Sequence, residues 1–205
     1  MSNSGGKLNM KNTKNLTYLA LFIAIEALMV MVPFLGFIPI GPLNATTLHI
    51  PVIIAAIVLG RKEGCIIGLV FGLFSMLKAT MNPSVVSFVF SPFISGNILS
   101  AVIAIFPRVM IGFVAATIYN LLKEKNDVTA MAVSSFFGAF TNTILVLGGI
   151  YVFFGVAYAK AMGTSFSALL PAFMTVVTTQ SLLEAVVGTV IAVAVSKALL
   201  KVKRG

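Results

Sequence analysis

The stretch VTAMAVSSFFGAFTNTILVLGGIYVFFGVAYA, from Val128 to Ala159, carries no charged side chain. A helix needs about 20 predominantly apolar residues to cross the hydrocarbon core of a bilayer, so this run is long enough to span it. Three further runs without Lys, Arg, Asp or Glu also exceed that length: Ala27 to Gly60, Ala79 to Pro107, and Ala161 to Leu183. The pattern predicts a membrane protein with several spans.

The composition of the whole chain excludes a water-soluble domain. Of its 205 residues, 59% are hydrophobic and 9% are charged, and the mean hydropathy is +1.09. Soluble domains carry about 25% charged residues. A membrane barrel would show alternating segments of about ten residues, whereas these apolar runs are continuous. The sequence therefore predicts an all-α, polytopic membrane fold.

A polar tail with three lysines (residues 1–15) precedes one transmembrane domain (residues 16–205), within which glycine and proline mark the joints between helices. We expect a bundle of six transmembrane helices in this domain. Their predicted ranges are Leu16–Pro33, Thr46–Gly60, Gly64–Thr80, Asn97–Lys123, Val128–Gly155 and Pro171–Leu200.

The basic residues predict the orientation of these helices. With six spans, eleven of the fourteen basic residues fall on one side, and the positive-inside rule makes that side the cytoplasm. Both termini, including the tail, are then cytoplasmic. The exceptions are Lys78, Arg108 and Lys160. The net charge of +9 is thus mainly an orientation signal, and its scatter over short segments argues against nucleic-acid binding.

The sequence has too few cysteines and histidines for a metal cluster or a disulfide framework. One cysteine (Cys65) and one histidine (His49) cannot supply a tetrahedral metal cluster or a disulfide framework. An intramembrane enzyme would need clustered carboxylates or histidines, and the predicted spans hold only one histidine and two scattered glutamates, Glu26 and Glu184. We therefore expect no metal and no catalytic residues.

Polar side chains inside the predicted spans are the candidate site residues, because such groups are costly in lipid and normally face a cavity or each other. Pro107 predicts a kink that places Arg108 at the outward end of a helix, where a ligand or Glu184 compensates its charge. The alternatives are a structural Arg108–Glu184 ion pair, an interfacial His49, and asparagines that only join helices. The full set is Glu26, Asn44, His49, Asn97, Arg108, Asn142, Gln180 and Glu184.

Small residues and one short helix add two expectations. Gly60, Gly64, Gly68 and Gly72 recur every four residues, which favours close packing between helices of this chain. The helix predicted at Thr46–Gly60 reaches only about 22 Å. Together with the proline-containing loops at 34–45 and 81–96, it leaves room for a cavity that opens outward.

Four segments of the chain resemble the substrate-binding (S) components of energy-coupling factor (ECF) vitamin transporters, most closely the pantothenate type. They are NATTLHIPVII from Asn44, SFVFSPF from Ser87, FPRVMIG from Phe106 and TNTILVLGGIY from Thr141. The AxxxA pair Ala20 and Ala24 is similar to the family's docking motif. The resemblance covers nearly all of the chain after residue 15.

The resemblance implies a multi-pass protein of the bacterial cell membrane that captures a vitamin and docks on a transmembrane coupling protein. Two cytoplasmic ATPases act through that coupling protein, so the S component would use no cofactor, and ATP would be hydrolysed by the partners alone. The chain indeed contains no G-x-x-x-x-G-K-[ST] phosphate loop. Ala20 and Ala24 would form the docking surface.

The chemistry of pantothenate suits the polar candidates. Its carboxylate calls for a cation, which Arg108 supplies, and its amide and hydroxyls call for small hydrogen-bonding partners. Those partners are Asn44, His49, Asn97, Asn142, Gln180 and Glu184. Riboflavin, hydroxymethylpyrimidine or pyridoxine as ligand, or an autonomous small-solute carrier, stay open as alternatives. The chain has no Trp for stacking, but 17 Phe keep stacking possible.

Overall fold

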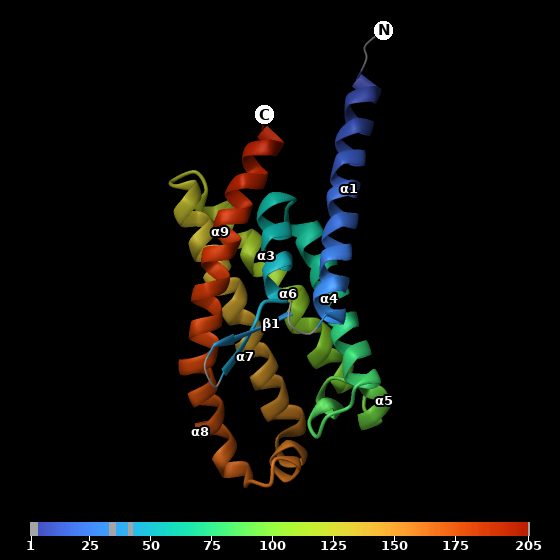
Figure 1. Cartoon of the computed structure of the whole chain (residues 1–205), viewed down its shortest axis with the longest axis vertical. Coiled ribbons are helices and arrows are strands. Elements are labelled where there is room, and N and C mark those ends of the chain that lie inside the picture. Colours follow the sequence, from blue (N-terminus) through green and yellow to red (C-terminus); the bar gives the residue numbers. More distant parts are fainter. Residues whose placement is uncertain (1–3, 33–35, 41–42, 205) are drawn as a thin grey trace.

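Five long apolar helices make up most of the molecule (Figure 1). The computed structural model describes residues 4–32, 36–40 and 43–204, with the backbone alone at 4–12, 37–40, 43–45 and 204. The stretches long and apolar enough to span a membrane are Thr13–Met31, Arg61–Met81, Leu99–Leu122, Asp127–Ala161 and Phe166–Lys203. The prediction of a largely helical chain with several helices suited to membrane spans is confirmed, and five such helices are found among the described residues where six were expected.

Three of the helices follow the predicted ranges closely. They are α4 (Arg61–Met81), α6 (Leu99–Leu122) and α7 (Asp127–Ala161), although α7 continues six residues beyond its predicted end. The first helix, α1 (Ser4–Met31), begins earlier than expected, and its backbone includes most of the tail predicted at residues 1–15. Its apolar part nevertheless begins at Thr13.

The helix predicted at Thr46–Gly60 is shorter than expected. It is observed as α3 (His49–Val58), because the preceding residues form a hairpin that the sequence analysis missed. In this hairpin, β1 (Phe37–Ile40) pairs antiparallel with β2 (Leu43–Thr46), and Phe37 lies opposite Thr46. Gly60, at a φ of 118°, then turns the chain into α4.

The last helix begins at Phe166, five residues before its predicted start at Pro171. It consists of α8 (Phe166–Val176), a π-helical turn η2 (Val177–Ser181) and α9 (Leu182–Arg204). Pro171 removes one backbone donor without ending the helix, as membrane helices tolerate. A π turn inside a helix is rare and frequently marks a functional site.

The short helix α3 lies at the centre of the bundle. All ten of its residues are buried, and it packs against α1, α4, α6, α7 and α9. Its C-terminal carbonyl, on Val58, accepts a hydrogen bond of 2.8 Å from Nζ of Lys203, near the end of α9. At about 15 Å, α3 reaches through about half of a hydrocarbon core. It therefore fills the centre of only one half of the bundle.

Glycines bring α4 directly against α6, as the four-residue spacing predicted. A Cβ on Gly72 would lie 2.8 Å from Cα of Ile105, and a Cβ on Gly68 would meet the carbonyl of Arg108. Gly64 faces both Ala56 of α3 and Gly112 of α6. The contact between Gly68 and the backbone of Arg108 fixes the height of Arg108 along α4.

The start of α1 and the end of α9 lie at the same end of the bundle in Figure 1. The turns between α3 and α4 and between α6 and α7 lie at this end as well. The opposite end carries a 3-10 turn η1 (Ser87–Val89), the short helix α5 (Pro92–Ser95) and the turn between α7 and α8. Most basic residues are therefore at the end that holds the termini.

Candidate functional site

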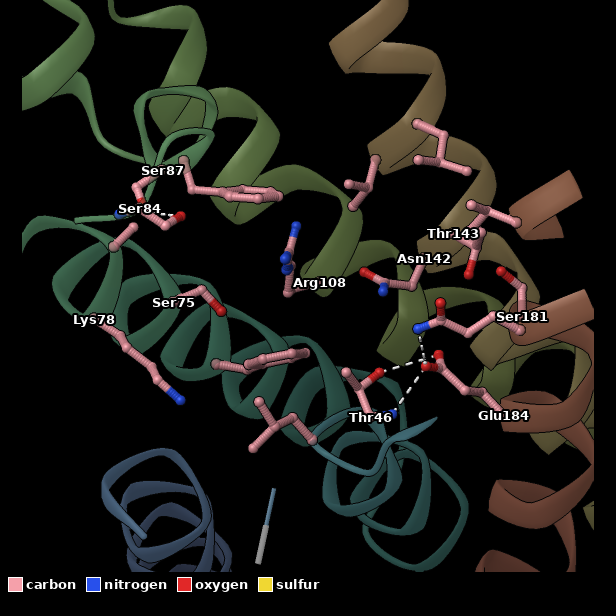
Figure 2. A pocket seen from close by; sticks show the side chains of 18 of the residues that line it. Thr46, Ser75, Lys78, Ser84, Ser87, Arg108, Asn142, Thr143, Ser181 and Glu184 are labelled. Atoms are coloured by element: carbon pink, nitrogen blue, oxygen red, sulfur yellow. Dashed lines mark hydrogen bonds between the residues drawn. The ribbon is translucent and has the colours of Figure 1, made fainter. Parts of the chain in front are cut away.

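A cavity of about 480 Å³ occupies the half of the bundle that α3 does not fill (Figure 2). Thr46 and Leu48, next to the N-terminal end of α3, close it on one side. Its walls come from α4, the segment around η1, α6, α7 and the helix that runs from α8 to α9. Ligand pockets for small molecules typically measure ~300–1,000 Å³, so the cavity has the size of a ligand site.

Polar side chains from six parts of the chain face this cavity. They come from β2, α4, the segment from α4 through η1, α6, α7 and the stretch from η2 into α9. The polar lining consists of Thr46, Ser75, Lys78, Asn82, Ser84, Ser87, Arg108, Asn142, Thr143, Gln180, Ser181 and Glu184. Apolar residues such as Phe71, Phe90 and Val146 complete the wall. A few polar groups in an apolar frame are typical of a site for a small polar ligand.

Arg108 is held in place by a hydrogen bond to a backbone carbonyl that Pro107 leaves unpaired. α6 continues through Pro107, so Arg108 lies within this helix and not at its outward end, where it was predicted. Proline has no N–H for the carbonyl four residues earlier, and Nη1 of Arg108 donates to that carbonyl, on Ile103, at 2.9 Å. The side chain that accounts for the unpaired carbonyl is therefore also one of the two cations of the described cavity lining.

Two phenyl rings fix the guanidinium of Arg108 further. Its central carbon lies 5.4 Å from the ring centroid of Phe71 in α4 and 5.1 Å from that of Phe90. Cation–π contacts at such distances contribute about 0.5–2 kcal/mol each, more where water is excluded. The Arg108 side chain is 8% exposed, and its Nε finds no partner among the described residues.

Glu184 does not pair with Arg108. The polar and aromatic contacts that the structure gives the Arg108 side chain are the Ile103 carbonyl and the two rings. Glu184 instead accepts hydrogen bonds from Thr46 N at 2.9 Å, Thr46 Oγ1 at 3.1 Å and Gln180 Nε2 at 3.0 Å. A structural Arg108–Glu184 ion pair, one alternative from the sequence, is thus not what the described residues form.

The structure brings four of the seven predicted ligand residues together. Arg108, Asn142, Gln180 and Glu184 line one cavity, and the buried Oδ1 of Asn142 has no partner among the described residues. The side chain of Asn44, in β2, lies outside the described residues, so its predicted role stays a prediction.

Two predicted ligand residues lie outside the cavity lining. Asn97 precedes α6, where its Oδ1 accepts from the backbone N–H of Leu99 at 3.0 Å. His49 is buried in α3 against α9, at a place where a Cβ on Gly188 would lie 2.7 Å from its Nε2. Glu26, a further intramembrane candidate, is fully buried in α1 and also lies outside this lining.

The hydroxyl-bearing wall was missed by the sequence analysis. Ser84 and Ser87 are linked to each other, with Ser87 Oγ accepting from Ser84 N at 2.8 Å, and both lie on the cavity wall (Figure 2). Burying a serine costs little free energy when its hydroxyl is hydrogen-bonded, and serine is common in helices and loops. The sequence therefore gave no signal that these two serines belong to a site. The nearby Lys78, noted as an exception to the charge pattern, was the available hint.

Comparison with known proteins gives the family. A family model described as "ECF transporter, substrate-specific component" matches residues 14–196. The Pantothenic acid transporter PanT of Lactococcus lactis subsp. cremoris (strain MG1363) is 35% identical over 95% of this chain and 98% of its own length. The Pantothenate transporter PanT of Leuconostoc mesenteroides subsp. mesenteroides is 29% identical over 95% of this chain and 96% of its own. The chain therefore belongs to the family of ECF transporter substrate-specific components.

Proposed function

We propose that the protein is the pantothenate-binding component of an ECF-type importer. The observation that carries this proposal is the guanidinium of Arg108, which lies in a cavity of about 480 Å³ without a described carboxylate partner. A buried cation without a partner is costly, and a ligand carboxylate compensates it. The names of the two relatives point to the same carboxylate-bearing vitamin.

The remaining cavity groups suit the rest of pantothenate. Its amide and hydroxyl groups need donors and acceptors, which Asn142, Thr143 and Gln180 offer from α7 and η2. Its methyl groups fit beside Val146 and Leu147. Asn142 Oδ1, which has no described partner, gains one when the ligand binds.

The fold supports an orientation with the termini in the cytoplasm of a bacterial cell. Most basic residues lie at the end of the bundle that holds both termini, as the positive-inside rule requires of a cytoplasmic end. The short α3 then brings the chain back to the cytoplasmic end without spanning the membrane on its own, and the cavity belongs to the outer half of the membrane. A ligand would enter it from outside.

Transport in this proposal requires partners that dock on α1. Ala20 and Ala24 are both exposed on this helix, where small side chains allow the backbone of another helix to approach closely. We assign this surface to the transmembrane coupling protein, through which two ATPases act. The protein itself would use no cofactor and catalyse no reaction, while ATP is used by the partner subunits.

Ligand release and thermal stabilisation test the proposal together. The purified protein is denatured, the small molecules it releases are identified by mass spectrometry, and the melting temperature is measured with a panel of vitamins. A ligand that binds only the folded state raises stability by about 2.7 kcal/mol at a hundred times its Kd. We expect release of pantothenate and stabilisation by it.

Two variants make this test specific to the cavity. Arg108→Gln is expected to lose the stabilisation by pantothenate. Arg61→Gln is the matched control, because Arg61 also lies over a phenyl ring, 5.1 Å from the centroid of Phe113, but outside the cavity. Stabilisation by riboflavin, hydroxymethylpyrimidine or pyridoxine instead of pantothenate would overturn the assigned ligand. Pantothenate uptake into liposomes without the ATPases would favour an autonomous carrier.

A further inference from the structure

We propose that Glu184 fixes the orientation of the ligand by excluding its anionic end from one half of the cavity. This inference rests on the proposed function and deepens it. It assigns the ligand carboxylate to the half that contains Arg108 and a hydroxyl of the ligand to Glu184. The cavity would then select molecules that carry an anion at one end and a hydrogen-bond donor at the other.

One half of the cavity is built for an anion. Arg108 and Lys78 contribute the two positive charges of the lining, from α6 and α4. Ser84 and Ser87 bring hydroxyl groups to the same region, as Figure 2 shows on the Lys78 side of Arg108. A planar carboxylate fits the forked donors of a guanidinium, and hydroxyl groups can complete its shell.

The other half carries the one carboxylate of the lining. Glu184 lies beside Gln180 and Thr46, on the far side of Asn142 from the serines in Figure 2. Its three hydrogen bonds all come from donor groups of Thr46 and Gln180, which suits the carboxylate form, an acceptor only. An ionised carboxylate repels a second anion, so the anionic end of a ligand is disfavoured here.

The geometry of Glu184 leaves space for a single ligand donor. A carboxylate has about four lone-pair positions, and three protein hydrogen bonds occupy three of them. These bonds also hold the end of β2 against η2 and α9, which keeps the carboxylate from turning away. A ligand hydroxyl can use the remaining position, whereas a ligand acceptor cannot.

The test combines three ligands with three forms of the protein. The ligands are pantothenate, its alcohol analogue with CH₂OH in place of the carboxylate, and N-(3,3-dimethylbutanoyl)-β-alanine, which keeps the carboxylate and lacks both hydroxyls. The proteins are the wild type, Arg108→Gln and Glu184→Gln. Kd is measured by isothermal titration calorimetry for all nine pairs, and the melting temperature without ligand checks folding.

We expect each variant to remove one preference and keep the other. Arg108→Gln removes the preference for pantothenate over the alcohol, and Glu184→Gln removes the preference for pantothenate over the deoxy analogue. Each preference in the wild type is expected to be about tenfold or more, as for a hydrogen bond to a charged group.

A purely structural role of Glu184 gives a different result. Glu184→Gln would then weaken all three ligands by the same factor, as we expect for Thr46→Val, which removes only the Thr46 side-chain bond to Glu184. That uniform loss would overturn the proposed ligand orientation and leave the assignment of pantothenate as ligand intact. The same holds if Arg108→Gln removed the preference for the hydroxyls and Glu184→Gln removed the preference for the carboxylate. A wild type that binds none of the three ligands overturns both.

Discussion

The molecule has a cavity and a groove of almost equal volume, and the two differ in the polarity of their lining. The cavity around Arg108 measures about 480 Å³, and a groove between α1, α3 and α9 measures about 460 Å³. Among the described residues, only Tyr18 and Thr47 bring polar side-chain atoms to the groove, whereas twelve polar side chains face the cavity. Volume alone therefore does not identify the ligand site, and the chemistry of the lining does.

The two regions also differ in what surrounds them. The cavity is lined by α4, α6, α7 and the helix from α8 to α9, while the groove follows the face of α1 that carries Tyr18, Phe22 and Ile25, and the exposed Ala20 and Ala24 are not part of its lining. An apolar groove in a membrane helix bundle suits lipid chains or the apolar face of another protein. If the cavity binds the vitamin and α1 binds the partner, variants in one region leave the function of the other intact.

The largest expected effect is on binding and comes from Arg108→Gln. Truncating one partner of a buried charge pair costs about 2–5 kcal/mol, so we expect the Kd for pantothenate to rise by about 30-fold to several thousand-fold. Assembly with the coupling protein is expected to stay unchanged. Calorimetry and co-purification measure the two effects, and unchanged affinity would refute the role of the cavity.

Ala20→Trp and Ala24→Trp are expected to produce the reverse pattern. A bulky indole prevents the close helix approach that small residues allow, so uptake in the assembled transporter falls to background. Pantothenate binding by the isolated protein stays at the wild-type Kd. Val152→Trp, at an exposed position of α7, is the matched control and is expected to transport normally. Normal uptake by both alanine variants would remove α1 as the docking surface.

A smaller effect is expected from Asn142→Leu. Comparing it with a substitution of Asn97 tests which of these two predicted ligand residues belongs to the site. Asn142 faces the cavity, and losing one hydrogen bond of about 1 kcal/mol weakens pantothenate binding by about fivefold. Asn97→Ser keeps an oxygen to cap the start of α6 and is expected to bind normally. A larger loss from Asn97→Ser than from Asn142→Leu would contradict the site.

The smallest predicted effect concerns the ring beside the guanidinium. Phe90→Leu keeps an apolar wall, and Phe71 and the Ile103 carbonyl still hold Arg108, so we expect a loss of only about 0.5 kcal/mol of cation–π energy and a rise in Kd of about twofold. Phe93→Leu is the control, because Phe93 is 77% exposed on α5. Equal affinities for wild type and Phe90→Leu would show that Phe71 and the Ile103 carbonyl suffice to place Arg108.

Much of the fold was predictable from hydropathy and from the residues at helix ends. The uncharged run from Val128 to Ala159 located α7, while glycine, proline and basic residues at the boundaries located α4 and α6. The hairpin at Phe37–Thr46 was not predictable, since its two strands have four residues each and no clear alternation. Pro171 was read as a helix start because, in water, proline interrupts a helix.

The site residues that the sequence predicted most clearly are the ionisable ones, because burying a charged group in a membrane costs much free energy. Arg108 and Glu184 stand out because ionisable groups inside a membrane need a reason to be there. The sequence did not show which way a neutral polar side chain faces, so His49 and Asn97 were grouped with Asn142. Ser84 and Ser87 gave no signal at all. Their place on the cavity wall depends on how η1 packs against α4 and α6.

An experimental structure with bound pantothenate tests the central claim most directly. We predict that the vitamin occupies the cavity, with its carboxylate oxygens about 2.7–2.9 Å from the guanidinium nitrogens of Arg108. Density for the vitamin in the groove between α1, α3 and α9, or in the cavity with the carboxylate away from Arg108, would contradict it.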